Sequence, residues 1–215
     1  MKVYCISGMG ADHRVFRRLK VEGVEFVPLP WVPIKNEDDL STYASRMAAQ
    51  LPVDEVPVIL GLSFGGMLAT EIAKQRSVKL AIILSSAKTH SELPEPGKMA
   101  RYIVRKRLIP PFLFAIPNRM IMTVHGVIKP WDKLSTVQAT AVSGRFMQTA
   151  INLILDWRNT TLPHNYVHVH GTADIVIPAR NVNATHWVKG GGHVMVYTKA
   201  GQISNILKDI LQPFL

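Results

Sequence analysis

The chain has 215 residues, of which 47% are hydrophobic and 19% charged, and its formal net charge is +10 at neutral pH. These values exclude a disordered or low-complexity chain and favour one globular domain, with or without an insertion. A lone cysteine excludes an intramolecular disulfide, and neither a signal peptide nor an apolar run of membrane-spanning length is present, so we expect a cytoplasmic protein.

Up to residue 87, short apolar runs that favour strands alternate with patterns that favour helices. The predicted strands are Val3–Ser7, Glu25–Leu29, Val56–Leu60 and Lys79–Leu84. The predicted helices run from Asp12, a candidate N-cap, to Lys20, over Thr42–Leu51 and over Gly66–Arg76. The fourth strand is aliphatic throughout, which is typical of a strand buried on both faces of a parallel sheet.

The alternation stops between about Lys88 and Gln148, where prolines recur and no strand pattern is convincing. It resumes with a helix at Ala150–Arg158, strands at Tyr166–His170 and Thr185–Val188, and a helix at Gln202–Leu211. Such alternation predicts a doubly wound α/β fold with a mostly parallel six-stranded sheet, because parallel neighbours need crossover connections. We therefore divide the chain into a core of residues 1–87 and 149–215 and an insertion of residues 88–148.

Binding sites in such sheets form at the carboxyl ends of the strands. After the third strand comes Gly61-Leu62-Ser63-Phe64-Gly65, a G-x-S-x-G sequence with a strand before it and a helix after it. The glycines permit a tight turn, and the serine lies at a helix N-terminus, where free N–H groups favour negative charge. The pattern predicts a serine nucleophile. The alternative is a glycine-rich turn that a serine merely caps.

A serine hydroxyl needs a base that takes its proton and an acid that orients the base. Asp174 follows the strand that ends in VHVHG, and His193 follows in VKGGGH. With the G-x-S-x-G motif, the chain order Ser63, Asp174, His193 resembles the α/β-hydrolase superfamily. The resemblance covers about residues 1–87 and 150–215. It implies an α/β-hydrolase fold in which the first two strands of the family are missing.

The resemblance also implies a role for each of these residues. Ser63 is the expected nucleophile, His193 the general acid and base, and Asp174 its orienting partner. The expected oxyanion hole consists of the backbone N–H groups of Phe64 and Met9. Many relatives have His-Gly ahead of the second position, where this chain has Ser7-Gly8, a departure that keeps the backbone donor but weakens any substrate analogy.

Family members commonly insert a cap or lid after the strand that is fourth here, so we expect residues 88–148 to form a helical cap. Its apolar residues suit an acyl or aromatic pocket, and Phe112, Phe114 and Met120 are the candidate substrate contacts. The equally open alternative is that these residues only pack the cap onto the core.

Alternative roles remain for three groups. Asp156 is a weaker candidate for the acid because its pattern is helical, while Asp174 and His193 have the simpler interpretation of a turn cap and a loop histidine. His168 and His170 alternate on one strand face, which suggests a metal, but no third ligand is suitably spaced. We therefore expect neither a metal nor a cofactor.

More than half of the net positive charge lies between residues 88 and 129. The basic residues there are Lys88, Lys98, Arg101, Arg105, Lys106, Arg107, Arg119 and Lys129. No zinc-finger spacing, RNA-binding aromatic motif or basic zipper accompanies them, so we expect a solvated basic face and no nucleic-acid partner.

The sequence carries no indication of an oligomeric state. It predicts a serine hydrolase of esterase type that acts on a small-molecule ester or thioester. Serine at position 63 excludes the aspartate nucleophile that some proteins of this fold use. The alternative function is a non-catalytic protein of the same fold that binds a small molecule or an anionic surface.

Overall fold

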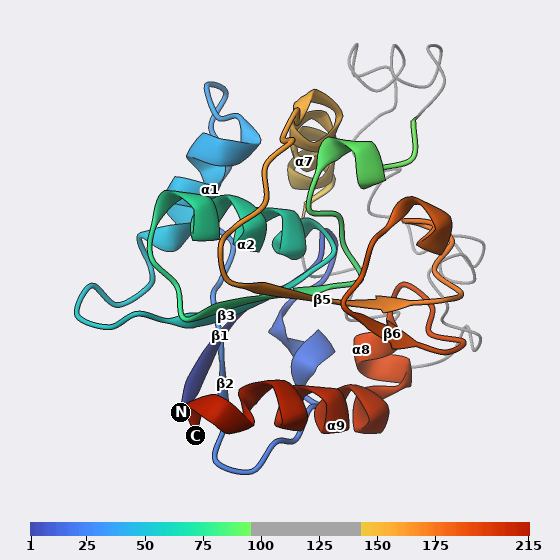
Figure 1. The fold of residues 1–215 in the computed structure, drawn as a ribbon. Helices are drawn as coiled ribbons and strands as arrows, with labels where there is room; N and C mark the ends of the chain where they lie inside the picture. Colours follow the sequence, from blue (N-terminus) through green and yellow to red (C-terminus); the bar gives the residue numbers. More distant parts are fainter. Residues whose placement is uncertain (96–142) are drawn as a thin grey trace.

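The computed structural model describes residues 1–95 and 143–215, whose centre is a six-stranded sheet (Figure 1). Its strands are β1 (Lys2–Ile6), β2 (Glu25–Pro28), β3 (Val58–Leu62), β4 (Leu80–Leu84), β5 (Tyr166–Gly171) and β6 (His186–Val188). Their order is β2-β1-β3-β4-β5-β6, and every pair within the described residues is parallel. The predicted doubly wound α/β fold is confirmed.

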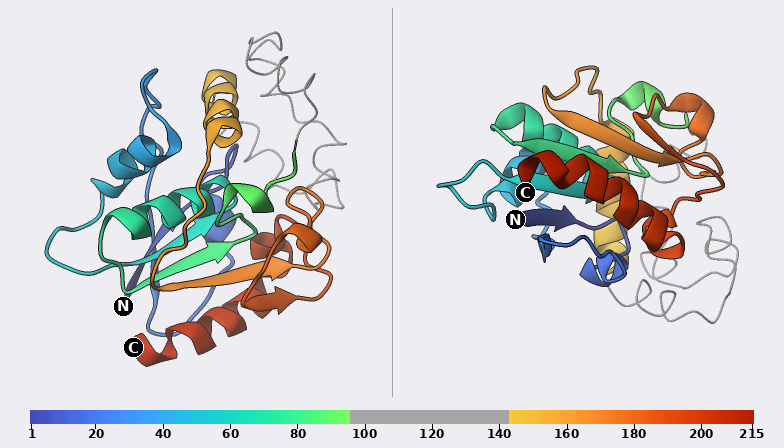
Figure 2. Two further views of the ribbon diagram at one scale, coloured as in Figure 1. Left: turned by 45° about the horizontal axis from the view of Figure 1, so that its top comes forward. Right: turned by 60° about the horizontal axis from the view of Figure 1, so that its bottom comes forward.

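Helices cover both faces of this sheet (Figures 1 and 2). One face carries α1 (Leu40–Ala48), α2 (Phe64–Gln75) and α7 (Gly144–Asp156). The other carries α8 (Met195–Thr198), α9 (Ala200–Leu211) and the 3₁₀ turn η1 (His13–Phe16). Further 3₁₀ turns are η2 (His90–Glu92), η3 (Ala179–Asn181) and η4 (Gln212–Phe214). None of the described helices has both the length and the apolar character needed to cross a membrane.

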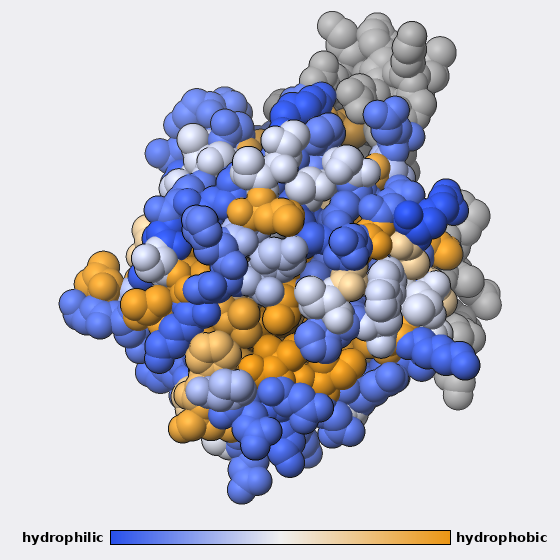
Figure 3. Space-filling view, viewed as in Figure 1, coloured by the Kyte–Doolittle hydropathy of each residue, from blue (hydrophilic) through white to orange (hydrophobic). Residues whose placement is uncertain are grey.

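Two apolar cores lie on opposite faces of the sheet because successive strand side chains point in opposite directions. Val58 and Leu60 belong to the core under η1, α8 and α9, whereas Ile59 belongs to the core under α1, α2 and α7. In Figure 3, apolar side chains gather between the sheet and α9, where this first core reaches the surface. The strands β3 and β4 are buried along their whole length, as the aliphatic pattern of β4 predicts.

The predicted helix from Asp12 to Lys20 is wrong in length, since η1 is a single 3₁₀ turn. Asp12 does cap it, accepting a hydrogen bond from the N–H of Arg14 at 2.9 Å. After the turn, Arg17 and Arg18 both approach Tyr197 of α8, with the Arg18 guanidinium carbon 3.7 Å from the ring centre. These tertiary contacts replace the continued helix.

Three boundaries that adjoin the predicted nucleophile or the predicted insertion also differ. β3 runs two residues further than Leu60, so the strand leads directly into Ser63, and α2 begins at Phe64 instead of Gly66. α7 begins at Gly144 instead of Ala150, because Ser143 caps it through the N–H of Phe146 at 3.2 Å. Phe112, Phe114 and Met120 lie outside the described residues, as does most of the expected cap.

Candidate active site

Ser63 stands at the junction of β3 and α2 with a backbone conformation that few residues adopt. Its φ of 53° and ψ of −119° lie in a region where a side chain is strained. Hydrogen bonds hold it there: the Ser63 N–H donates to the carbonyl of Leu84 at 2.9 Å, and the Ser86 hydroxyl donates to the carbonyl of Ser63 at 2.6 Å. The strained turn is thus fixed to the end of β4.

The two flanking glycines are required by close backbone approach. A Cβ atom at Gly61 would overlap the carbonyl of Gly65, and a Cβ atom at Gly65 would overlap the carbonyls of Ile6 and Ser7 at the end of β1. These positions therefore accept only glycine if the turn is to keep its shape. The spacing of the G-x-S-x-G motif follows from this packing.

Ser63, His193 and Asp174 form one hydrogen-bonded chain, although they follow three different strands. His193 Nε2 lies 2.8 Å from Ser63 Oγ, and His193 Nδ1 lies 2.8 Å from Asp174 Oδ2. An ionised carboxylate only accepts hydrogen bonds, so Nδ1 carries the proton and Nε2 is left to accept from the serine. Asp156, the alternative acid, is an exposed residue at the end of α7.

Asp174 is 3% exposed and is held in its loop by backbone donors. Its Oδ1 accepts from the N–H groups of Val176 at 2.9 Å and Ile177 at 3.0 Å. Burial alone would raise the pKa of this carboxyl, but the hydrogen bond and charge of His193 and the N–H of Ile177 hold the pKa below its usual value. The carboxylate is therefore ionised at neutral pH. His170, four residues earlier on β5, lies with Nε2 3.0 Å from the Ile177 carbonyl.

The two expected oxyanion donors lie on segments that meet at Ser63. A Cβ atom at Gly8 would lie 3.4 Å from Ser63 Cβ, so the turn after β1, which carries Met9, packs against Ser63. Phe64 is the first residue of α2, and its N–H is among those that have no acceptor within the helix. Ser7, which stands where relatives often have histidine, donates its hydroxyl to the carbonyl of Ala11 at 2.9 Å and steadies the same turn.

Ser63 opens into a cavity of about 450 Å³. Most of its lining is apolar and comes from the turn after β1, α2, the segment after η2, the end of α7 and the loop after Asp174: Met9, Met67, Leu93, Pro94, Ile154, Leu155, Trp157, Val176 and Ile177. His90, Glu95 and Arg158 are its polar members besides Ser63 among the described residues. The sequence did not lead us to expect that residues 90–95 line a cavity at Ser63. The only signal was that residues 90–95 follow the carboxyl end of a strand next to β3.

The model of the alpha/beta hydrolase family matches residues 3–204. The chain belongs to the alpha/beta hydrolase family. This confirms the resemblance inferred from the order of serine, aspartate and histidine, and at the level of enzyme class it assigns the chain to the hydrolases. Among proteins with curated functions, none matches this alpha/beta hydrolase.

Several solved structures share the fold of this alpha/beta hydrolase at low identity. An esterase from Thermogutta terrifontis, solved with malate bound, gives a TM-score of 0.72 at 16% identity, covering 99% of this chain and 90% of that one. An enol-lactonase from Burkholderia xenovorans LB400 gives 0.70 at 12% identity, covering 98% and 91%. A lipase-esterase related protein from Clostridium acetobutylicum ATCC 824 gives 0.69 at 13% identity, covering 97% and 93%. At these identities the likeness shows the fold.

A second set of buried titratable groups lies near the candidate site, and we call Lys88, Glu92 and His168 the buried ion-pair cluster. The Lys88 ammonium donates to the Glu92 carboxylate, lies 3.0 Å from His168 Nδ1 and donates to the carbonyl of Asn183 at 3.0 Å. Lys88 is 3% exposed, Glu92 6% and His168 0%. Nothing in the sequence indicates that this i, i+4 pair is buried, because such pairs are normally on the surface.

His168 and His170, considered above for a metal, lie edge to face with ring centres 5.2 Å apart. Burial, the Lys88 charge and the neighbouring His170 lower the pKa of His168 to about 2, and burial also lowers the pKa of His170. Both imidazoles are therefore neutral. Within residues 1–95 and 143–215, no three His, Cys, Asp or Glu side chains are grouped so that they could hold a metal ion.

Proposed function

We propose that this alpha/beta hydrolase is a serine esterase that cleaves small carboxylic esters or thioesters through an acyl-enzyme on Ser63. One observation carries the proposal: Ser63, His193 and Asp174 are linked by two hydrogen bonds of 2.8 Å, and Ser63 lines a cavity. A hydroxyl bonded to an imidazole, itself bonded to a buried carboxylate, is the arrangement that makes a serine nucleophilic.

In the first half of the reaction, Ser63 Oγ attacks the acyl carbon while His193 Nε2 takes its proton. The carbonyl oxygen becomes an oxyanion, which the N–H groups of Met9 and Phe64 stabilise. Asp174 stabilises the resulting imidazolium. When the tetrahedral intermediate collapses, the bond to the alcohol or thiol breaks, and His193 gives its proton to that leaving group.

The second half uses the same groups with water as the nucleophile. His193 takes a proton from a water molecule, whose oxygen attacks the acyl carbon of the ester on Ser63. The second intermediate then expels Ser63 Oγ, which recovers its proton from His193, and the acid is released. No step needs a redox cofactor or a metal.

The lining of the cavity supports an acyl group with an apolar body. Apolar side chains surround Ser63 from α2, α7 and the loop after Asp174, so a hydrocarbon chain gains free energy on entering. Esterases and an enol-lactonase are among the proteins of similar fold, which favours acyl transfer for this chain too.

A fluorophosphonate probe and a series of p-nitrophenyl esters of increasing chain length test the proposal. We expect the wild-type protein to be labelled at Ser63 and to hydrolyse the esters. Ser63→Ala should prevent labelling and lower turnover by about 10⁴- to 10⁶-fold. The control Ser91→Ala removes an exposed hydroxyl between the lining residues His90 and Leu93 and should leave labelling and turnover unchanged.

A wild-type protein that resists the probe and hydrolyses no ester would contradict the proposal. Saturable binding of a small molecule or of anionic vesicles by that inactive protein would instead support the non-catalytic alternative. Turnover above about a tenth of the wild-type value in Ser63→Ala would assign the nucleophile to another residue.

A further inference from the structure

Trp31, in the loop after β2, contacts both segments that carry the proposed oxyanion donors. Its ring stacks on that of Phe64, with centres 5.6 Å apart and planes 29° from parallel. Its indole N–H donates to the carbonyl of Ala11 at 3.2 Å. Sequence reasoning assigned no role to this residue, because nothing in the composition of its loop shows that it lies beside the nucleophile.

The carbonyl of Ala11 closes the turn that carries Met9. The N–H of Ala11 donates to the carbonyl of Gly8 at 3.0 Å, and the hydroxyl of Ser7 donates to the Ala11 carbonyl at 2.9 Å. The indole N–H is thus the second donor on this carbonyl. Because Ala11 is hydrogen-bonded to both Ser7 and Gly8, a displacement of its carbonyl would also displace the turn and the Met9 N–H within it.

Phe64, the other donor, is held in a stack of three rings. Trp31 lies on one side, and Tyr43 of α1 lies 6.3 Å from Phe64 on a plane 16° from parallel. Tyr43 and Phe64 are almost fully buried, and the Tyr43 hydroxyl donates to the carbonyl of Val32 at 2.8 Å. Trp31 is therefore tied to α1 through its own neighbour in the chain, and the stack fixes the side chain whose backbone N–H is used.

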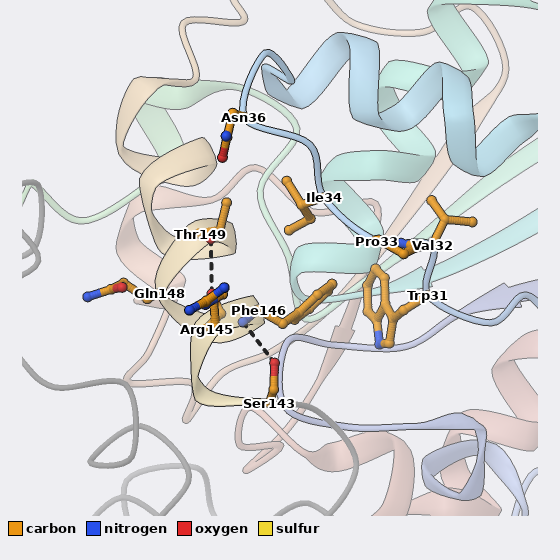
Figure 4. A pocket seen from close by; sticks show the side chains of 10 residues that line it. All are labelled: Trp31, Val32, Pro33, Ile34, Asn36, Ser143, Arg145, Phe146, Gln148 and Thr149. Atoms are coloured by element: carbon orange, nitrogen blue, oxygen red, sulfur yellow. Dashed lines mark hydrogen bonds between the residues drawn. The ribbon is translucent and has the colours of Figure 1, made fainter.

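Trp31 also contacts Phe146 in the first turn of α7, with ring centres 5.3 Å apart (Figure 4). Both rings border a groove of about 870 Å³, which also includes Ile34, Arg145 and Thr149. Met147, next to Phe146, reaches the oxyanion turn, with Sδ 3.1 Å from the place of a Cβ at Gly10. The start of α7 thus supports Trp31 and the turn together.

We propose that Trp31 is a positioning residue that sets the spacing of the two oxyanion donors, an inference that rests on the proposed function. Donors stabilise an oxyanion only when both lie about 2.7–3.1 Å from the position that it will occupy. Trp31 is the side chain that bonds to one donor segment and stacks on the other. Trp31 is not one of the described residues that line the Ser63 cavity. It therefore acts through Met9 and Phe64 and not on the substrate.

The test compares Trp31→Leu, Trp31→Phe and the control Phe26→Leu. Trp31→Phe keeps an aromatic ring but loses the indole N–H, whereas Trp31→Leu loses both contacts. Phe26 is a half-buried aromatic residue on β2, but it packs against the core on the opposite face of the sheet. The measurements are kcat and KM for p-nitrophenyl butyrate, the affinity for an alkyl boronic acid and the midpoint of thermal unfolding.

The boronic acid forms a tetrahedral, anionic adduct with Ser63 Oγ, whose proton passes to His193, and one boronate oxygen occupies the oxyanion hole. We expect Trp31→Leu to lower kcat and boronate affinity together, each by about tenfold, with KM within about twofold. Trp31→Phe should lower both by about threefold, since the ring stack remains. Phe26→Leu should lower the unfolding midpoint and leave kcat and boronate affinity unchanged.

Two results would overturn the inference while leaving the proposed function standing: an active Trp31→Leu enzyme with unchanged kcat, or one whose kcat falls without any loss of boronate affinity. If Trp31→Leu does not fold, the same two criteria apply to Trp31→Phe. A wild-type protein that neither reacts with fluorophosphonate nor hydrolyses esters would overturn the proposed function and the role of Trp31 with it.

Discussion

Two groups of hydrogen-bonded polar side chains lie near the carboxyl ends of β3 to β6. They differ in whether the group reaches a cavity. In the chain of Ser63, His193 and Asp174, the last member is a hydroxyl that lines a cavity. In the buried ion-pair cluster, the Lys88 ammonium meets the Glu92 carboxylate, the His168 imidazole and a backbone carbonyl, all within the protein.

The Glu92 carboxylate likewise accepts its hydrogen bonds from groups within the protein. Its Oε2 accepts from the N–H of Lys88 at 2.7 Å, and its Oε1 accepts from the N–H of Asn183 at 3.3 Å as well as from the Lys88 ammonium. Both groups contain a carboxylate and a histidine, so burial and composition do not separate a reactive site from a structural one. The proposed reactive group is distinguished by its open end on a cavity, together with a serine on a strained turn.

Of the changes that test this comparison, Asp174→Asn should have the largest effect, because it alters the buried carboxylate of the chain that reaches Ser63. The amide favours the wrong tautomer of His193, so kcat should fall by about 10⁴-fold while the fold is kept. Ester hydrolysis and thermal unfolding measure the two effects. Asp156→Asn is the matched control, because Asp156 is exposed on α7, and it should behave as wild type.

An unaffected Asp174→Asn enzyme would show that Asp174 is not the acid. If Asp156→Asn were inactive instead, the acid would be assigned to α7. If Asp174→Asn is only partly folded, the Val176 and Ile177 N–H groups need the charge of Asp174, and kcat per folded molecule decides the role of Asp174.

The second-largest effect is expected from Lys88→Met, which removes the ammonium group of the buried ion-pair cluster. Glu92 would be left as a buried charge without its partner, which typically costs about 3–5 kcal/mol in free energy of unfolding. The kcat of the folded fraction should stay within about threefold of wild type, because the cluster donates nothing to Ser63. Urea unfolding and active-site titration measure these quantities.

The double variant Lys88→Met/Glu92→Gln is the control for that experiment. The neutral amide oxygen still accepts hydrogen bonds from the backbone, so we expect it to recover a large part of the lost stability. If Lys88→Met lowered kcat as steeply as Asp174→Asn does, the cluster would belong to the catalytic machinery and the distinction between the two groups would fail.

The open group was predictable from sequence because its constraints are local. The tight turn demands glycine at 61 and 65, and Ser63, Asp174 and His193 each follow a strand within a few residues. Parallel strands bring their carboxyl ends to one edge, so the order of strands was enough to predict that these side chains are near one another.

The closed group and Trp31 were not predictable because their contacts join distant segments. Lys88 and His168 are brought together by the pairing of β4 with β5, and the carbonyl that also accepts from Lys88 belongs to Asn183 in a third segment. The same holds for the stack of Trp31 on Phe64. Likewise, the predicted helix after Asp12 failed because Arg17 and Arg18 pack on Tyr197, a residue 180 positions away from Arg17.

The smallest effect is the pH dependence that the closed group imposes on stability. The unfolded chain protonates His168 near pH 6.5, whereas burial, Lys88 and His170 lower the pKa of His168 in the folded protein to about 2. Between these values the unfolded state binds more protons, so stability falls as the pH falls, by about 1.4 kcal/mol per pH unit. Above about pH 6.5 this group contributes no pH dependence.

His168→Gln tests this directly, because a glutamine can accept from Lys88 but does not titrate. Between pH 7.5 and 5.0 the wild-type protein should lose about 2 kcal/mol more free energy of unfolding than the variant, as measured in urea. His170, whose pKa is also lowered by burial, remains in both proteins, so its contribution cancels. Parallel pH profiles would mean that solvent or a proton reaches His168 in the folded state, and the cluster would then be open like the group around Ser63.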